Sequence, residues 1–205
     1  MDDTQAEAAH REEAHQQLSP IGRKLFKYVE FDENEVLIAE IRKHPIGIFF
    51  ISAGGIFIGL TVLIGTLFLG ANFDSYASGV TENTGSAGAI IIGIGLLLSL
   101  LIIGVTAISI VLYIRNVVFV TNEKIAEVSY VSLFNRRVLQ LNIGKVEDVT
   151  IFQKGILSHL FEYGSMLIET AGETPNPSFT LVPRPSYFSK KIIEAHEKYV
   201  EKYGN

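Results

Sequence analysis

Two long stretches without a charged side chain constrain this chain more than any other feature. The first runs from Pro45 to Phe73 and the second from Asn83 to Ile114. At about 1.5 Å of rise per residue, a helix over residues 46–70 would reach roughly 37 Å, and one over 87–114 would be longer. A hydrocarbon core is about 30 Å thick, so each stretch predicts a transmembrane helix.

The alternative interpretation is a pair of buried helices in a soluble protein. Core helices rarely stay apolar on every face over such a length, because one face normally meets water. The first stretch follows a charged segment, which argues against a signal peptide. Neither stretch contains an ionisable residue, and this argues against a pump, carrier or channel built from this chain alone.

Basic residues are distributed unevenly around the two predicted spans. Arg42 and Lys43 precede the first span, Arg115 follows the second, and the connector 71–86 holds no Lys or Arg. By the positive-inside tendency both termini are predicted to be cytoplasmic, and 71–86 a short extracytoplasmic loop. We therefore expect a multi-pass protein of the cell membrane, with Arg42, Lys43, Tyr113 and Arg115 at the inner interface.

Glycines recur in the predicted spans. Gly55 and Gly59 form a G-x-x-x-G pattern, which predicts a close helix contact, either within the hairpin or between protomers. Glycine is also common in membrane helices in general, so both interpretations stay open.

Composition narrows the classes of function. The chain has 205 residues and a formal net charge of -5, which is no footprint of a nucleic-acid-binding protein. It has no cysteine, which removes disulfides, thiol nucleophiles and Cys-ligated metal sites. His10 and His15 are awkwardly spaced for two ligands on one helical face. We expect no metal site and no cofactor.

The segment before the first span divides into two parts. Residues 1–20 are polar and lack an apolar stripe, which predicts a disordered tail. Residues 21–45 mix apolar and charged side chains, and they predict a cytoplasmic juxtamembrane segment. This segment would hold a short packing element, then a strand or helical approach to the membrane that ends at Pro45.

The hydrophobic period changes after the second span. Short β-branched and aromatic runs, from "NVVFVT" to "FTLVP", are separated by turn residues and predict strands. The last run, "SYFSKKIIEAHEKYVEKYG", has the helical period. Strands followed by one amphipathic helix predict a small α+β module over residues 115–203.

Four segments carry a family resemblance. They read "RNVVFVTNEKI", "IGKVEDVTIFQKGILSHLFEYGSMLIETAG", "FTLVPRPSYFSKKI" and, before the first span, "FDENEVLIAEIRKHP". In this order they resemble the bacterial pleckstrin-homology-like (PH-like) domain of membrane proteins with two preceding transmembrane helices. The resemblance implies a bent antiparallel barrel or sandwich of seven strands, capped by the C-terminal helix. It implies no reaction, substrate or catalytic residue.

Residues that could support catalysis do not form a recognised pattern. Ser158 and His159 are adjacent, with Glu162 nearby, but adjacent side chains on a turn generally point apart. Glu147 and Asp148 are neighbours on a predicted strand, and so lie on opposite faces. We expect no catalytic residue and no enzyme.

Binding is the remaining class of function. The turn "VTNEKI" has Lys124 beside Glu123, so it lacks the basic cluster found around the first hairpin of phosphoinositide-binding PH domains. The stronger basic group is Arg136, Arg137, Lys145, Lys154 and Arg184. It predicts a surface for anionic lipid or an acidic partner, unless these are ordinary solvated charges.

The sequence thus favours a membrane-anchored PH-like protein that acts as a non-enzymatic adaptor or assembly subunit at the cytoplasmic face. The alternatives are an anionic-lipid sensor and an accessory subunit of a transporter or membrane enzyme. The expected partners are membrane lipids and a protein partner or a second copy of the chain, but not nucleic acid.

Overall fold

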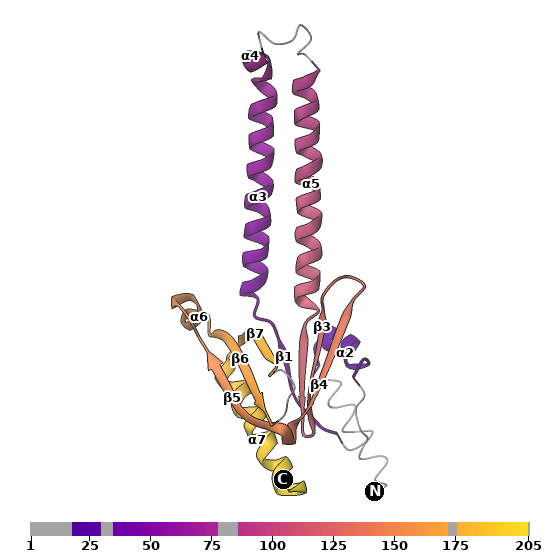
Figure 1. Ribbon diagram of the computed structural model, residues 1–205, viewed down its shortest axis with the longest axis vertical. Helices are drawn as coiled ribbons and strands as arrows, with labels where there is room; N and C mark the ends of the chain where they lie inside the picture. The colour runs from indigo at the N-terminus through magenta and orange to yellow at the C-terminus, as the bar shows by residue number, and fades with distance from the viewer. Residues whose placement is uncertain (1–17, 30–34, 78–85, 172–175, 205) are drawn as a thin grey trace. The chain divides into compact units, whose positions relative to one another are not determined.

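The computed structural model describes residues 18–29, 35–77, 86–171 and 176–204. The chain divides into two compact units, one over 47–111 and the other over 1–46 together with 112–205. We call the first the helix unit and the second the sheet module, and Figure 1 labels the elements of both.

Two long apolar helices dominate the helix unit. Helix α3 spans Ile46–Ala71, α5 spans Ala87–Ile114, and the short α4 (Phe73–Ala77) follows α3. At 1.5 Å per residue the long helices measure roughly 39 and 42 Å. Most of their apolar side chains are exposed, among them Phe57 and Leu97. By length and composition, both helices are able to cross a membrane.

Small residues set the contact between α3 and α5. A methyl group at Gly55 would collide with the side chain of Thr106. The Ser99 hydroxyl donates a hydrogen bond of 3.3 Å to the carbonyl of Gly59. Both glycines of the G-x-x-x-G pattern therefore face the partner helix within the hairpin, where the absence of a side chain lets two backbones approach.

A four-stranded antiparallel sheet forms one layer of the sheet module, in the order β1-β2-β3-β4. Its strands are β1 (Leu37–Arg42), β2 (Val117–Thr121), β3 (Lys124–Tyr130) and β4 (Arg136–Asn142). Strand β1 precedes α3 and β2 follows α5, yet the two pair directly, from Leu37 opposite Thr121 to Arg42 opposite Val117. Two neighbouring strands of one sheet are thus joined by the whole helix unit.

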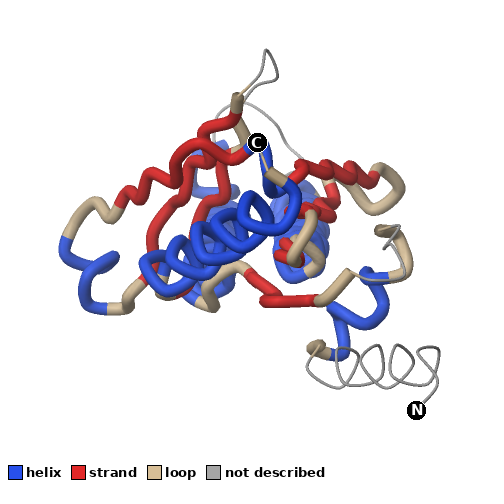
Figure 2. Tube along the Cα trace, turned by 90° about the horizontal axis from the view of Figure 1, so that it is seen from below, coloured by secondary structure: helices blue, strands red, loops and turns tan. Residues whose placement is uncertain are grey.

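A three-stranded antiparallel sheet and a helix complete the module. The sheet has the order β5-β6-β7, with β5 (Val146–Phe152), β6 (Tyr163–Thr170) and β7 (Ser178–Pro183). The 3-10 turn η1 (Ile143–Lys145) precedes β5, and the short helix α6 (Ile156–Leu160) joins β5 to β6. Helix α7 (Pro185–Tyr203) packs on β5, β6, β1 and η1, and Figure 2 shows it lying across the strands.

The core of the module lies between the two sheets and α7. Its buried side chains come from all three layers, because each contributes the apolar half of an alternating or helical pattern. They include Val118, Val120, Ile125, Met166, Ile168, Phe179, Phe188 and Ile192.

A second apolar cluster covers the outer face of the first sheet. Helix α2 (Pro20–Phe26) brings Leu25 there, and the residues flanking it bring Leu18 and Val29, against Phe119 and Val128 of the sheet. Leu18 retains only 2% of its exposure. Strand β2 of the first sheet is therefore buried on both faces.

The N-terminus of α2 is held by a carboxylate from β1. Glu40 accepts hydrogen bonds from the backbone N–H and the hydroxyl of Ser19, at 2.7 and 2.5 Å. Ser19 in turn caps α2 by accepting a bond from the N–H of Gly22 at 2.9 Å. A negative charge at this point also suits the positive end of the helix dipole.

The expected α+β class is confirmed, with two apolar helices, antiparallel sheets and a C-terminal helix. The module itself starts earlier than residue 115, because α2 and β1 come from the segment 21–45 and β1 pairs in the sheet. Leu18, at the end of the segment 1–20 that we expected to be a disordered tail, is buried. Residues 1–17, with His10 and His15, lie outside the described residues, as do 78–85 of the predicted loop.

Candidate functional site

The sheet module has two distinct ends, defined by the strand register. At one end Arg42 lies opposite Val117 and, beyond it, Tyr130 lies opposite Arg136. The chain passes into α3 just after Arg42 and returns from α5 just before Val117. We call this the junction end, and we call the end with the β2–β3 turn the distal end.

His44 ties the junction end together. Its backbone N–H donates to the carbonyl of Leu181 in β7 at 2.6 Å, and its own carbonyl accepts a bond of 2.6 Å from the Tyr113 hydroxyl. Its ring lies 5.5 Å from that of Tyr163, and its Nδ1 accepts a bond from the N–H of Ile46. Burial lowers the pKa of His44, which favours the neutral ring that can accept this bond. His44 therefore connects three parts of the chain: the segment that leads into α3, the end of α5 and the second sheet.

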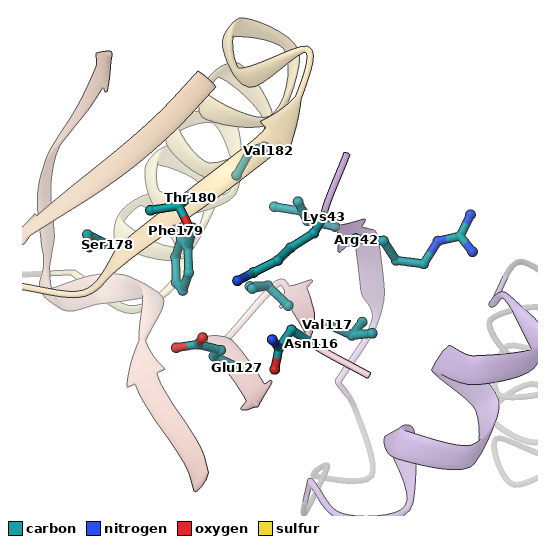
Figure 3. Close-up of a pocket in the computed structure, with 11 residues that line it drawn as sticks. Arg42, Lys43, Asn116, Val117, Glu127, Ser178, Phe179, Thr180 and Val182 are labelled. Carbon is teal, nitrogen blue, oxygen red and sulfur yellow. The ribbon is translucent and has the colours of Figure 1, made fainter. Parts of the chain in front are cut away.

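A narrow cleft opens beside this junction, between β1, β2, β3 and β7. Figure 3 shows Lys43 extending into it toward Glu127 and Phe179. Burial raises the pKa of Glu127, against the opposing effect of the positive charges of Arg137 and Lys43. The cleft measures about 50 Å³, far below the roughly 300 Å³ at which small-molecule sites begin. It has room for a water molecule but not for an organic substrate.

The β3–β4 turn, residues 131–135, presents apolar side chains at the junction end. Phe134 at its tip is 98% exposed, and Val131 and Leu133 are exposed too. The turn is ordered, because the N–H of Val131 donates to the carbonyl of Asn135 at 3.0 Å and the Ser132 hydroxyl accepts from the N–H of Asn135.

The α6 loop, residues 153–162, also presents apolar side chains, beside the second sheet. Ile156 is 85% exposed, and Leu157, Leu160 and Phe161 also face outward. Ser158 points inward and is buried, and its hydroxyl donates to the carbonyl of Gly155 at 2.7 Å. The loop is therefore a fixed turn with an apolar outer surface, beside a shallow hollow of about 320 Å³ lined by Phe152, Lys154, Ser158, Tyr163 and Leu181 among others.

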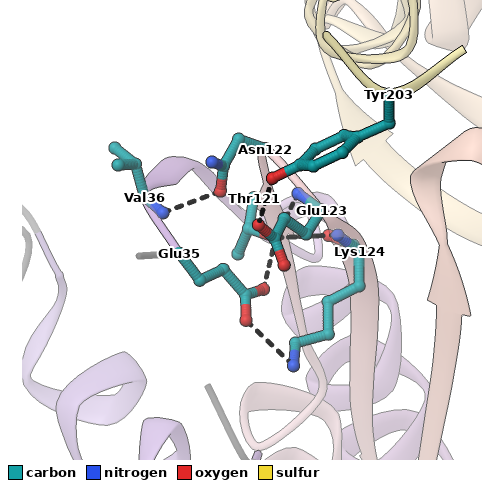
Figure 4. A network of polar contacts seen from close by, with 7 residues as sticks. All are labelled: Glu35, Val36, Thr121, Asn122, Glu123, Lys124 and Tyr203. Carbon is teal, nitrogen blue, oxygen red and sulfur yellow. Dashed lines mark hydrogen bonds and ion pairs between the residues drawn. The ribbon is translucent and has the colours of Figure 1, made fainter. Parts of the chain in front are cut away.

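The distal end is built differently, from polar groups that satisfy one another. Figure 4 shows Glu35 in an ion pair of 2.9 Å with Lys124, with its carboxylate accepting a bond of 2.5 Å from the Thr121 hydroxyl. The Glu35 side chain is 0% exposed and that of Lys124 is 14% exposed. Asn122 accepts from the N–H of Val36 at 2.7 Å.

Comparison with known proteins identifies the fold. A family model described as bacterial PH domain matches residues 46–196, which include both long helices. This chain belongs to the bacterial PH domain family. The resemblance seen in the sequence is confirmed, and we call the sheet module the PH-like module from here on.

Among solved structures, the chain is similar to a DUF1696 family protein with a pleckstrin-homology domain from Shewanella loihica PV-4. The two are 11% identical, the match covers 41% of this chain and 73% of that chain, and the TM-score is 0.34. No curated protein matches the chain.

The predicted basic group is divided by the PH-like fold. Lys145 lies just before β5 and Lys154 just after it, so they occupy opposite ends of that strand, with Lys145 near the distal end. Arg136 and Arg137 begin β4 at the junction end, where the Arg136 guanidinium lies 3.7 Å from the centre of the Tyr28 ring. Arg184 follows β7, near the α6 loop, and its N–H donates to the Glu162 carbonyl. Four of the five residues thus share the junction end, and Lys145 does not.

The predicted interface residues lie together at the junction end of the PH-like module. Lys43 lies 5.5 Å from the centre of the Tyr113 ring, and Arg115 lies 5.4 Å from that of Tyr130. Arg42 extends toward Glu40, at 3.7 Å.

Sequence reasoning missed Glu127, Glu35 and the exposed apolar turns. The turns had a visible signal, since "SLFN" and "GILSHLF" place apolar residues where turns are normally polar. Glu35 and Glu127 had none, because the residues that they meet lie in other segments of the chain.

The catalytic candidates gain no support from the geometry. The Ser158 hydroxyl is bound to a backbone carbonyl of its own turn. Among the described residues, no group of three or more His, Asp or Glu side chains is placed to hold a metal ion.

Proposed function

We propose that this chain is a membrane-anchored, non-enzymatic adaptor or assembly subunit whose PH-like module works at the cytoplasmic face of the cell membrane. One observation carries the proposal: β1 and β2 pair directly although the helix unit separates them in sequence. A module on one flexible linker can tumble, whereas two short connections from adjacent strands restrict its orientation. A module held in this way suits the presentation of one surface to neighbours in or at the membrane.

The anchoring itself rests on α3 and α5. Their exposed apolar side chains would be costly in water and are favourable in lipid. The basic residues Arg42, Lys43 and Arg115 stand at the junction end, which favours a cytoplasmic module by the positive-inside tendency. A topology reporter fused after Ser78 tests this orientation: we expect an extracytoplasmic signal, and a cytoplasmic signal would reject it.

An edge strand supports the adaptor role. Strand β4 pairs with β3, and within the described part of the chain no strand pairs with its other edge. Such an edge is a ready site for addition of a partner strand.

Photo-crosslinking from this edge in native membranes tests the proposal. A photo-reactive residue at Gln140, exposed on β4, should form adducts with another membrane protein, identified by mass spectrometry. The same group at Glu201, exposed near the end of α7, is the matched control. Adducts only between copies of this chain would indicate self-assembly and count against a hetero-adaptor.

Anionic-lipid sensing is a second candidate, favoured by Arg136, Arg137, Lys154 and Arg184 at the junction end. Amide hydrogen exchange of the full chain in bilayers with and without anionic lipid tests it. Sensing predicts greater protection of residues 131–142 in the anionic bilayer, lost when Arg136 and Arg137 are both changed to Gln. Equal protection in both bilayers would count against sensing.

A further inference from the structure

The exposed apolar side chains of the PH-like module are concentrated in two places. Among its described residues, every exposed Val, Ile, Leu or Phe except Val36 lies either in the β3–β4 turn or in the α6 loop and the residue directly before it. They are Val131, Leu133, Phe134, Phe152, Ile156, Leu157, Leu160 and Phe161. Soluble surfaces scatter such residues singly, so a concentration of this kind marks a contact surface.

The β3–β4 turn and the α6 loop are each adjacent to a tyrosine that contacts the residues next to α3 or α5. Tyr130, which precedes the β3–β4 turn, donates its N–H to Asn116 at 2.9 Å and packs under Arg115. Tyr163, which follows the α6 loop, packs its ring beside that of His44. His44 lies just before α3, which begins at Ile46, and Asn116 lies just after α5, which ends at Ile114.

The apolar side chains are presented by fixed turns. Backbone and hydroxyl hydrogen bonds close the β3–β4 turn, and the buried Ser158 fixes the α6 loop. The chain therefore holds these apolar groups outward in a defined conformation, without burying them against its own described residues.

The charges nearby fit lipid headgroups. Arg136 and Arg137 follow the β3–β4 turn directly, Lys154 precedes α6 and Arg184 lies beside the α6 loop, with Glu162 as the acidic exception. Apolar tips flanked by cationic side chains are the pattern of segments that lie in an anionic membrane interface.

We propose that the β3–β4 turn and the α6 loop insert their apolar tips into the same membrane leaflet that α3 and α5 enter. The occupant is lipid, because the chain itself passes into the bilayer at this end, which holds both tips at the interface whether or not a partner protein is present. The PH-like module then has four attachments, the two helix junctions and the two apolar tips. This inference rests on the membrane anchoring proposed above.

Single cysteines allow a direct test, because the chain has none. Phe134→Cys and Ile156→Cys place an environment-sensitive NBD fluorophore at the two tips. Val36→Cys is the matched control, since it is exposed and apolar but lies at the distal end. Leu97→Cys, in α5, reports on the spanning helix. The full-length chain is reconstituted in vesicles of phosphatidylethanolamine and phosphatidylglycerol, with or without lipids that carry a nitroxide quencher.

We expect the probes at 134 and 156 to emit at shorter wavelength than the probe at 36, and to be quenched by lipids with a shallow nitroxide. The probe at 97, toward the middle of α5, should be quenched by lipids that carry the nitroxide deep in the acyl chain. If the probe at 97 is quenched but those at 134 and 156 behave like the probe at 36, insertion is overturned and the anchoring stands. If the probe at 97 is not quenched, the anchoring fails and insertion fails with it. Tip probes that are shielded from water but not quenched by lipid would show that protein covers the tips, which also overturns insertion.

Discussion

The two ends of the PH-like module differ in which side chains they bury and which they expose. At the distal end, Glu35, Thr121 and Lys124 bury their polar groups against one another. At the junction end, Phe134 and Ile156 are held outward by ordered turns. The buried polar groups of the distal end thus find hydrogen-bond and ion-pair partners within the chain. At the junction end, the described residues leave these apolar side chains exposed, and we propose that lipid covers them.

The largest expected effect comes from breaking the distal ion pair. Lys124→Met removes the cation that forms an ion pair with the buried Glu35 carboxylate, which should cost about 3–5 kcal/mol of the free energy of unfolding. Thermal unfolding in mild detergent should show a fall in Tm of more than about 10 °C. The control Lys190→Met removes an exposed pair with Glu194 and should cost at most about 1 kcal/mol. Equal effects of both changes would contradict a structural role for the distal network.

A smaller loss should follow removal of the carboxylate that holds α2. Glu40→Ala removes the acceptor of two hydrogen bonds from Ser19, which should cost about 1–3 kcal/mol. Limited proteolysis should then cleave faster within residues 18–29, as α2 separates from the sheet. Glu147→Ala, at an exposed position on β5, is the control. Unchanged cleavage in the Glu40 variant would show that apolar packing alone holds α2.

The cleft at the junction end should make stability depend on pH. Because burial raises the pKa of Glu127 above 4.5, the folded state keeps its proton at pH values where the unfolded state has released it. Stability due to this group should therefore fall as pH rises from about 4.5 through the raised pKa, and stay constant above it. Glu127→Gln should remove this fall, measured as Tm between pH 4 and pH 8. An identical pH profile in the variant would show that Glu127 does not titrate in this window.

The smallest effect on folding is expected at the apolar tips. The double change Phe134→Ser and Ile156→Ser removes apolar groups that contact little of the chain, so the free energy of unfolding in detergent should change by less than about 0.5 kcal/mol per site. Val120→Ser, at a fully buried core position, should instead cost several-fold more. If the tip changes destabilise the protein as much as the core change, the contrast between the two ends is wrong.

Local patterns predicted much of the molecule. The helices were expected over 46–70 and 87–114 and run over Ile46–Ala71 and Ala87–Ile114, because a charge-free run is read directly from the sequence. The strands and the C-terminal helix followed from their periods of two and 3.6 residues. Basic residues next to the spans also needed no fold to be noticed. What these patterns could not show is which distant segments meet.

The sequence by itself determined the apolar hairpin, the run of strands with a C-terminal helix that follows it, and the PH-like family. Only the tertiary structure decided that Leu37–Arg42 pairs with Val117–Thr121 across the hairpin, that Lys145 stands apart from Arg136, and that Glu35 is buried with Lys124. It also decided that two apolar turns from different sheets share the end where the helices join. The physical reason is that periodicity reports which side of an element is buried, whereas pairing depends on where the folded core returns the chain.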